Sequence, residues 1–154
     1  LIENPDQLRR LQEDPSLIPG AAEEILRRAT PVMHFRRTAT RDTELAGVQI
    51  PKGARLVVVY AGANRDPDVW GDDPDRFDPD REQIKKHIAF GQGVHICLGQ
   101  FIARAQIEEG LHQIAQRLHN PRRTGPSGWR PFFGVWGLRG LPFAHDPAAV
   151  LEGV

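Results

Sequence analysis

The chain has 154 residues, of which 40% are hydrophobic, enough to bury one modest core. Its 20 basic and 20 acidic side chains give a formal charge of zero, which argues against a nucleic-acid-binding surface. The single cysteine excludes an internal disulfide and a multi-cysteine zinc site, and no apolar run is long enough to span a membrane. A cytoplasmic protein is therefore predicted.

The chain starts at Leu1 and not at a methionine, so we expect residues 1–154 to be a single partial domain of a longer protein. A short polar helix is predicted over 6–13, and a compact helix over 21–29, which Pro31 ends. Beyond them the pattern changes from helical to extended.

Residues 44–50 are predicted to form one short strand, followed by a turn at 51–53. The β-branched run over 55–60 predicts a buried strand. Residues 63–84 are crowded with Asp, Pro and Arg, and predict an ordered but irregular meander.

The best helix is predicted over 98–119, and Asn120-Pro121 ends it. Beyond it, aromatic residues interspersed with Gly and Pro predict short hairpins, and 146–154 is predicted to be a loose tail. The helix carries one apolar stripe at helical spacing, made of Ala103, Ile107, Leu111, Ile114 and Leu118.

Residues 90–99 carry most of the functional information. Cys97 lies just before the long predicted helix, whose N-terminus favours a thiolate. Such a thiolate suits axial ligation of a haem iron, and the alternative is a buried structural cysteine. Beside it lie an aromatic residue and three glycines, which permit a positive φ or the close approach of a flat partner: Phe90, Gly91, Gly93 and Gly99.

Other candidate residues are less specific by themselves. His95 could lie on the surface, bind a metal or donate to a haem carboxylate. Arg37 could form a charge-assisted bond with the same carboxylates or lie solvated at a strand end. Glu24 and Arg27 are three residues apart on a predicted helix, so their side chains can meet. Arg76 taken alone is an ordinary arginine.

In this order, the motifs resemble those of the cytochrome P-450 family. Glu24-Ile25-Leu26-Arg27 is similar to its E-x-x-R helix motif, and Pro74-Asp75-Arg76-Phe77 is similar to P-E-R-F with Asp in place of Glu. The resemblance is to soluble bacterial members and extends to about Phe143. The haem-binding signature F-x-x-G-x-x-x-C-x-G is matched by Phe90, Gly93, Cys97 and Gly99.

The resemblance implies a mainly α fold with small β-sheets, the C-terminal part of the P-450 fold. Cys97 would be the proximal ligand of haem b, with Phe90 shielding its sulfur, and Glu24, Arg27 and Arg76 would form a buried structural network. The implied haem contacts are Cys97, His95, Arg37, Phe90, Gly91, Gly99 and Ala103. The implied substrate-pocket residues are Val32, Met33, Val135 and Trp136.

The implied activity is a monooxygenase that inserts one oxygen atom of O2 into a small hydrophobic organic substrate. Its electrons would come from NAD(P)H through a ferredoxin or flavodoxin docking on the proximal face, where Gln100 and Arg104 are candidates. The long distal helix with its acid–alcohol pair is not among these residues, so the chain would supply the proximal half of the site.

Three alternatives remain open at this point. The chain could be a truncated, inactive haem-binding fragment, or a peroxide-driven haem-thiolate enzyme. It could also be a hydrolase or transferase with Cys97 as nucleophile and His95 as base. The last is disfavoured, because residues two apart in a glycine loop rarely meet in that geometry and no third orienting group is evident.

Overall fold

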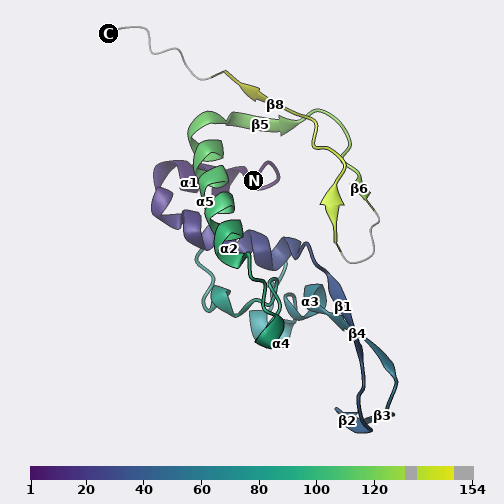
Figure 1. Ribbon diagram of the computed structural model, residues 1–154. Coiled ribbons are helices and arrows are strands. Elements are labelled where there is room, and N and C mark those ends of the chain that lie inside the picture. The colour runs from purple at the N-terminus through teal and green to yellow at the C-terminus, as the bar shows by residue number, and fades with distance from the viewer. Residues whose placement is uncertain (131–134, 148–154) are drawn as a thin grey trace, which may run out of the picture.

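In the computed structural model, which describes residues 1–130 and 135–147, helices form the packed body and two-stranded antiparallel sheets extend from it (Figure 1). The longer helices are α1 (Pro5–Glu13), α2 (Ile18–Ala29) and α5 (Gln100–Arg117). Short helical turns are η1 (Pro15–Leu17), α3 (Tyr60–Ala63), α4 (Pro67–Trp70), η2 (Ile84–Lys86) and η3 (Gly93–His95). The strands are β1 (His34–Thr38), β2 (Thr43–Leu45), β3 (Val48–Ile50), β4 (Arg55–Val59), β5 (His119–Arg123), β6 (Trp129–Arg130), β7 (Gly137–Leu138) and β8 (Phe143–Asp146).

All three long helices were predicted, with different ends. α2 begins three residues before the predicted start, because Pro19 lies in its first turn, where a missing N–H costs nothing. α5 begins after Gly99 and ends at Arg117, since Leu118 is already extended and leads into β5.

The core lies where α1, α2 and α5 meet the irregular segment 64–83. In the predicted stripe of α5, Leu111 is buried and Ile107 is half-buried against this core, whereas Ile114 is exposed. The buried apolar residues of the cluster are Leu11, Ile18, Ala21, Ala22, Phe77, Leu111 and Ala115. The segment itself is ordered as predicted, and the short helix α4 lies within it.

Two strand predictions were wrong. Residues 44–50 form a hairpin of β2 and β3, because Ala46 and Gly47 both take positive φ angles, of 47° and 81°, and reverse the chain. β4 pairs antiparallel with β1, but it is not buried: Val57 is 56% exposed and Val59 is 51% exposed. The β-branched run is sufficient for an extended strand, but the described chain places no second layer over this two-stranded ladder.

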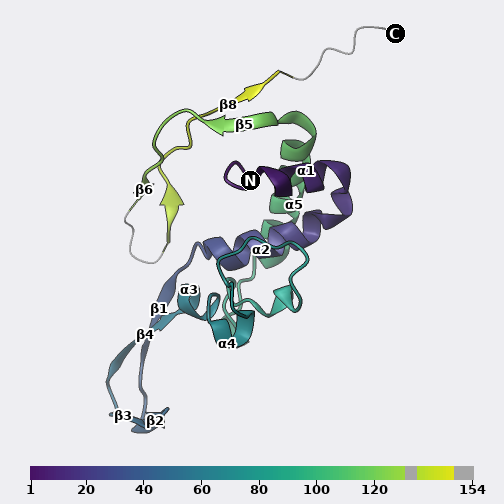
Figure 2. The same cartoon turned by 180° about the vertical axis from the view of Figure 1, so that it is seen from behind.

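β5 and β8 lie at the end of α5 far from the β1–β4 arm, whereas β6 lies between them and that arm, as both views show (Figures 1 and 2). β5 pairs with β8 and β6 pairs with β7, and the Trp129 and Trp136 rings lie 5.4 Å apart, as expected for short hairpins that pack aromatics. Asp146, in the predicted tail, belongs to β8, and residues 148–154 of that tail lie outside the described residues. Two aromatic residues of the predicted hairpins, Phe132 and Phe133, also lie outside them. None of the helices described here combines the length and apolar character needed to cross a bilayer.

We predict opposite effects of two glycine substitutions. Gly20→Ala would place a Cβ 2.3 Å from the Pro79 carbonyl oxygen, so it should lower the free energy of unfolding by about 1–3 kcal/mol. Gly110→Ala, in the middle of α5, meets nothing within 4 Å and should raise it by about 0.5–1 kcal/mol through helix propensity. Urea unfolding followed by circular dichroism measures both, and equal effects would contradict the described packing of α2 on segment 64–83.

Candidate functional site

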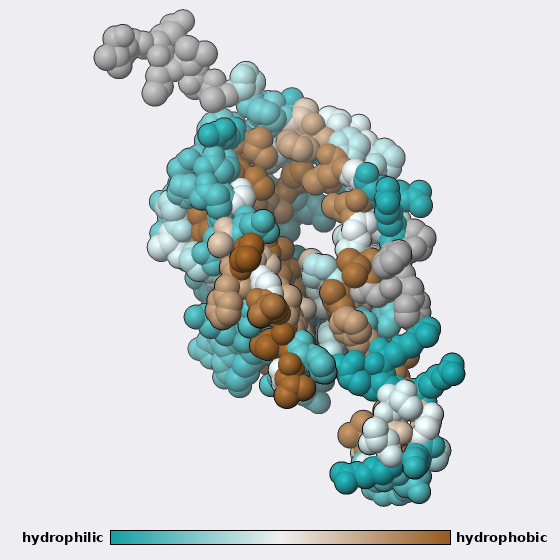
Figure 3. Space-filling model, in the orientation of Figure 1, coloured by the Kyte–Doolittle hydropathy of each residue, from teal (hydrophilic) through white to brown (hydrophobic). Residues whose placement is uncertain are grey.

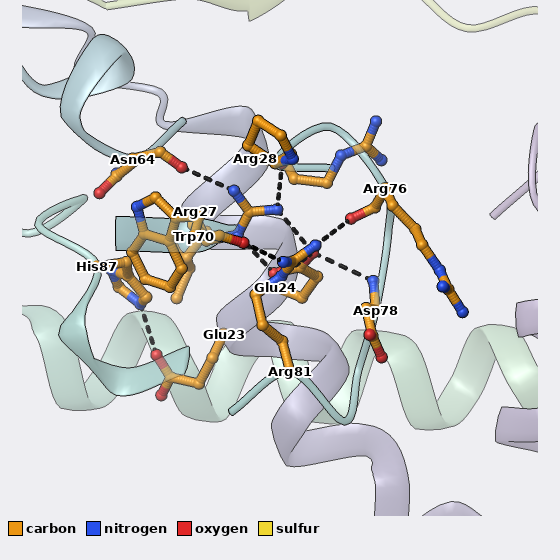
Figure 4. A network of polar contacts seen from close by, with 12 residues as sticks. Glu23, Glu24, Arg27, Arg28, Asn64, Trp70, Arg76, Asp78, Arg81 and His87 are labelled. Atoms are coloured by element: carbon orange, nitrogen blue, oxygen red, sulfur yellow. Dashed lines mark hydrogen bonds and ion pairs between the residues drawn. The ribbon is translucent and has the colours of Figure 1, made fainter. Parts of the chain in front are cut away.

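Two neighbouring glutamates of α2, Glu23 and Glu24, are both buried and bind different parts of the chain (Figure 4). Successive residues of an α-helix point about 100° apart, so the two side chains leave α2 in different directions. Glu24 faces the irregular segment 64–83, whereas Glu23 faces the segment that leads into α5. A buried carboxylate without partners is costly, so each of these groups needs its own donors.

Glu24 forms a fully buried ion pair with Arg27, one turn along α2. Arg27 Nε donates to one carboxylate oxygen over 2.7 Å and Nη2 donates to the other over 2.8 Å, and both side chains are 0% exposed. Further guanidinium donors reach the carbonyl oxygens of Asn64 and Pro74, each at 2.7 Å. The predicted pair is therefore present, and it ties α2 to two points of the irregular segment.

Arg81 is the third side chain of this network, where the sequence analysis expected Arg76. Arg81 Nε donates to Glu24 Oε1 over 3.4 Å, and its Nη atoms donate to three backbone carbonyl oxygens, one of them that of Arg76. The Arg76 side chain is exposed and points away from Glu24 (Figure 4). Its neighbour Phe77 turns its ring into the core, which leaves Arg76 on the solvent side.

Glu23 binds two side chains that flank the cysteine loop. His87 Nε2 lies 2.7 Å from Glu23 Oε2, and Arg104 of α5 donates from Nε to Oε1 over 2.6 Å and from Nη2 to Oε2 over 3.3 Å. Burial acts to raise the pKa of the Glu23 carboxyl, but the bonds from Arg104 and His87 together outweigh it and hold the pKa below its usual value of 4.5.

Cys97 lies at the surface, between η3 and the first residue of α5. Its backbone N–H donates to the Phe90 carbonyl oxygen over 2.9 Å, which closes the loop on itself. Gly91 and Gly93 have φ angles of 73° and 79°, in the region that favours glycine. Gly99 has a φ of −81°, which other residues also adopt, and a Cβ there would make an ordinary contact of 3.9 Å with Cys97 Sγ.

The surface around Cys97 is apolar, and the thiol is exposed in the described part of the chain. Val94 and Leu98 are each 97% exposed. Figure 3 shows hydrophobic side chains gathered over the lower part of α5 and the loop below it. A patch of this kind is normally covered in a folded protein, by a ligand, by a partner or by another part of the same protein. Its exposed apolar members are Val94, Ile96, Leu98, Phe101 and Ile102.

Within residues 1–130 and 135–147, no three His, Cys, Asp or Glu side chains converge as a metal site. Cys97 is the single cysteine of the chain. Haem iron can take one thiolate from a protein, because the porphyrin ring supplies four nitrogen ligands.

Comparison with known proteins identifies the family. The family model described as "Cytochrome P450" matches residues 16–120, more than half of the chain. The chain belongs to the cytochrome P450 family.

Three relatives illustrate how far the match to other P450 proteins extends. The chain is 43% identical over 144 residues to cytochrome P450 CYP199A2 of Rhodopseudomonas palustris, covering 94% of this chain and 34% of that protein. It is 39% identical over 148 residues to cytochrome P450-terp of a Pseudomonas species, covering 96% and 34% respectively. The solved structure of CYP153D17 from a Sphingomonas species matches with a TM-score of 0.88 and 40% identity, covering 95% of this chain and 36% of that one.

The solved P450 structures confirm the predicted fold class, in which helices are combined with small sheets. At 34% of each protein, the chain spans about a third of the length of these two curated relatives.

Of the two predicted partners of the haem carboxylates, His95 lies within the cysteine loop and Arg37 lies beside it. His95 is exposed at the end of η3. Arg37 is exposed on β1, and its Nη2 donates to Tyr60 Oη over 3.4 Å. A Cβ on Gly91 would lie 4.0 Å from the same Tyr60 oxygen, so Tyr60 brings Arg37 close to the loop. Ala103 is half-buried in the first turn of α5.

The four residues predicted for a substrate pocket lie together. Val32 and Val135 form an isolated antiparallel bridge, and Trp136 N–H donates to the Pro31 carbonyl oxygen over 2.7 Å. Met33 and Trp136 line one cavity of about 490 Å³. Their role toward a substrate remains a prediction.

Sequence reasoning missed Glu23, His87 and Arg81. Arg81 could not be told from other arginines, because its network partners are mostly backbone oxygens distant in sequence. Arg104, expected as a candidate for partner contact, is engaged with Glu23 and donates to Gln100 Oε1 over 2.9 Å. The available signal was the adjacent pair Glu23-Glu24 on the predicted helix, since the sequence analysis assigned a partner to only one of the two charges.

Separate substitutions of Arg81 and Arg76, the two arginines of the irregular segment, test whether Arg81 is the third member of the network. Arg81→Met removes the second cation on buried Glu24 and three bonds to carbonyl oxygens, so the free energy of unfolding should fall by about 3 kcal/mol. Arg76→Met is the matched control and should change it by no more than about 0.5 kcal/mol. Urea unfolding of both variants decides the matter, and a larger loss in Arg76→Met would restore the original prediction.

The lowered pKa of Glu23 predicts a specific loss of stability in acid. The folded chain favours the charged carboxylate more than the unfolded chain does, so this stabilisation is full above the usual pKa of 4.5 and is lost as the pH falls through the lowered value. Glu23→Gln should therefore be less stable near neutrality and lose stability less steeply below about pH 4.5. Unfolding free energies measured at several pH values test this, and an unchanged slope would rule out Glu23 as the source.

Proposed function

We propose that this chain supplies the proximal side of a haem-thiolate site, with Cys97 as the axial ligand of haem b. The observation that carries the proposal is an exposed lone thiol at the start of α5, inside an apolar surface. The sulfur lies directly before the N-terminus of α5, where backbone N–H groups have no partner within the helix. Residues 1–154 would form one partial domain of such an enzyme.

The shape and chemistry of this surface fit a flat, mostly apolar group. Val94, Leu98 and Phe101 would lose water contact beneath a macrocycle, and removal of apolar surface from water is favourable. Gly91 and Gly99 present no side chain that would hold such a ring away from the sulfur. Phe90, which is half-buried beside the loop, would shield the thiolate from water.

Two side chains are proposed to bind the carboxylates at the edge of the cofactor. Arg37 would offer a charge-assisted bond, and Tyr60 fixes the direction of its guanidinium. His95 would offer a ring N–H from the exposed end of η3. These bonds would orient the group in its plane, while Cys97 sets its distance from α5.

We propose a monooxygenase as the activity of the enzyme to which this chain contributes. When bound, the haem supplies the oxidative chemistry that puts one oxygen atom of O2 into an organic substrate. The thiolate of Cys97 would push electron density toward the iron, and the chain would hold that sulfur in place and keep it dry. Electrons would come from NAD(P)H through a ferredoxin or flavodoxin in the cytoplasm, and Val32, Met33, Val135 and Trp136 would contact a hydrophobic substrate.

Haem binding without turnover is the second candidate function. It needs only the loop around Cys97 and the apolar surface beside it, which residues 1–154 contain. Peroxide-driven oxidation would use the same thiolate ligand, and turnover that needs added ferredoxin would separate it from the monooxygenase.

Cys97→Ser tests the proposal directly. The chain loaded with haem, reduced and exposed to carbon monoxide should show the strongly red-shifted Soret band of a thiolate ligand, and the variant should lose it. Because Cys97 is exposed, the far-UV circular dichroism of the variant should stay the same.

Met33→Leu is the matched control, since Met33 carries the other sulfur atom of the chain. It should keep the red-shifted band. A band that survives in Cys97→Ser, or a parent chain that holds haem with an unshifted band, would contradict ligation by Cys97.

A further inference from the structure

The Glu23 carboxylate binds one side chain on each side of the loop that contains Cys97. Glu23 on α2 binds His87, which lies before the cysteine loop, and Arg104, which lies after it on α5. From the position of Glu23, we propose that this residue is a positioning residue for Cys97, acting through His87, Arg104 and Phe90. The inference rests on the proposed role of Cys97 as the haem ligand.

The first contact fixes the histidine. The Ala89 N–H donates to His87 Nδ1 over 3.2 Å, so Nδ1 is the acceptor and the proton lies on Nε2. That N–H then donates to Glu23 Oε2 over 2.7 Å. The His87 ring is buried, and its orientation is therefore set from both sides.

The second contact brings Arg104 onto Phe90. Arg104 Cζ lies 4.7 Å from the centre of the Phe90 ring, and the His87 ring centre lies 6.2 Å from it. Both partners of Glu23 therefore touch the same aromatic side chain. A guanidinium held by two bonds to a carboxylate keeps one orientation, which a cation over an aromatic face needs.

The third contact is a backbone hydrogen bond that links Phe90 to Cys97. The Phe90 carbonyl oxygen accepts the Cys97 N–H over 2.9 Å, so the backbone of Cys97 is bonded to the residue that Arg104 and His87 confine. Glu24, the next residue, binds donors on α2 and in segment 64–83 instead. The two carboxylates therefore bind different parts of the chain. Glu24 holds the irregular segment 64–83, and Glu23 holds the cysteine loop.

Amide hydrogen exchange in the full chain without haem tests the loop itself. Glu23→Gln removes the charge that accepts three bonds from His87 and Arg104, and the amide nitrogen of Gln cannot accept from either, so the Cys97 amide should exchange at least about tenfold faster. The Ala39 amide, bonded to the Ala54 carbonyl oxygen in the distant β1–β4 arm, should be unchanged. Glu109→Gln on the exposed face of α5 is the matched control and should alter neither amide.

The second readout is spectroscopic. In haem-loaded chain under carbon monoxide, Glu23→Gln should convert part of the red-shifted band to the unshifted band, and Glu109→Gln should not. Arg104→Lys keeps the charge but loses the two-bond fork over Phe90, so it should reproduce both effects even if Glu23→Gln fails to fold.

The outcomes separate the two proposals. A parent with the red-shifted band, together with variants whose Cys97 amide and band are unchanged, would overturn the positioning role and leave Cys97 as the ligand. Equal acceleration of the Cys97 and Ala39 amides would also overturn it, because the effect would then be general destabilisation. A haem-loaded parent without the red-shifted band would overturn the haem proposal itself.

Discussion

The structure depends on the burial of two adjacent negative charges on one turn of α2. Neither carboxylate can stay unpaired away from water, so each recruits donors from outside the helix. Because the two side chains point about 100° apart, those donors come from different segments. Glu24 fixes the irregular segment through Arg27 and Arg81, and Glu23 fixes the entrance and exit of the Cys97 segment. α2 therefore fixes the irregular segment and the cysteine loop relative to each other.

This arrangement accounts for the order of the glycine-rich loop, whose backbone has many accessible conformations when unfolded. The loop has little packing of its own, and its apolar side chains face outward. Its order comes from backbone bonds such as that between Cys97 and Phe90, and from the side chains on which Phe90 rests. The Cys97 sulfur lies at the surface of the described chain.

Motifs with fixed spacing were predictable from the sequence, and contacts between distant segments were not. The Cys97 loop and the Glu24–Arg27 pair lie within short stretches, so spacing alone places them correctly. Arg81 replaces the expected Arg76 because the direction of a side chain in an irregular segment depends on which neighbour, here Phe77, enters the core. The run that forms β4 was expected to be buried, since β-branched residues favour strands whether or not a second layer covers them. Glu23 was missed because its partners lie far along the chain.

X-ray absorption at the iron edge of the haem-loaded chain tests the central claim most directly, because it reports the atoms bound to the metal. The account predicts one sulfur atom among the nearest neighbours of iron, besides the four nitrogens of the ring. A shell of nitrogen and oxygen atoms alone, in a chain that is folded and holds haem, would contradict it.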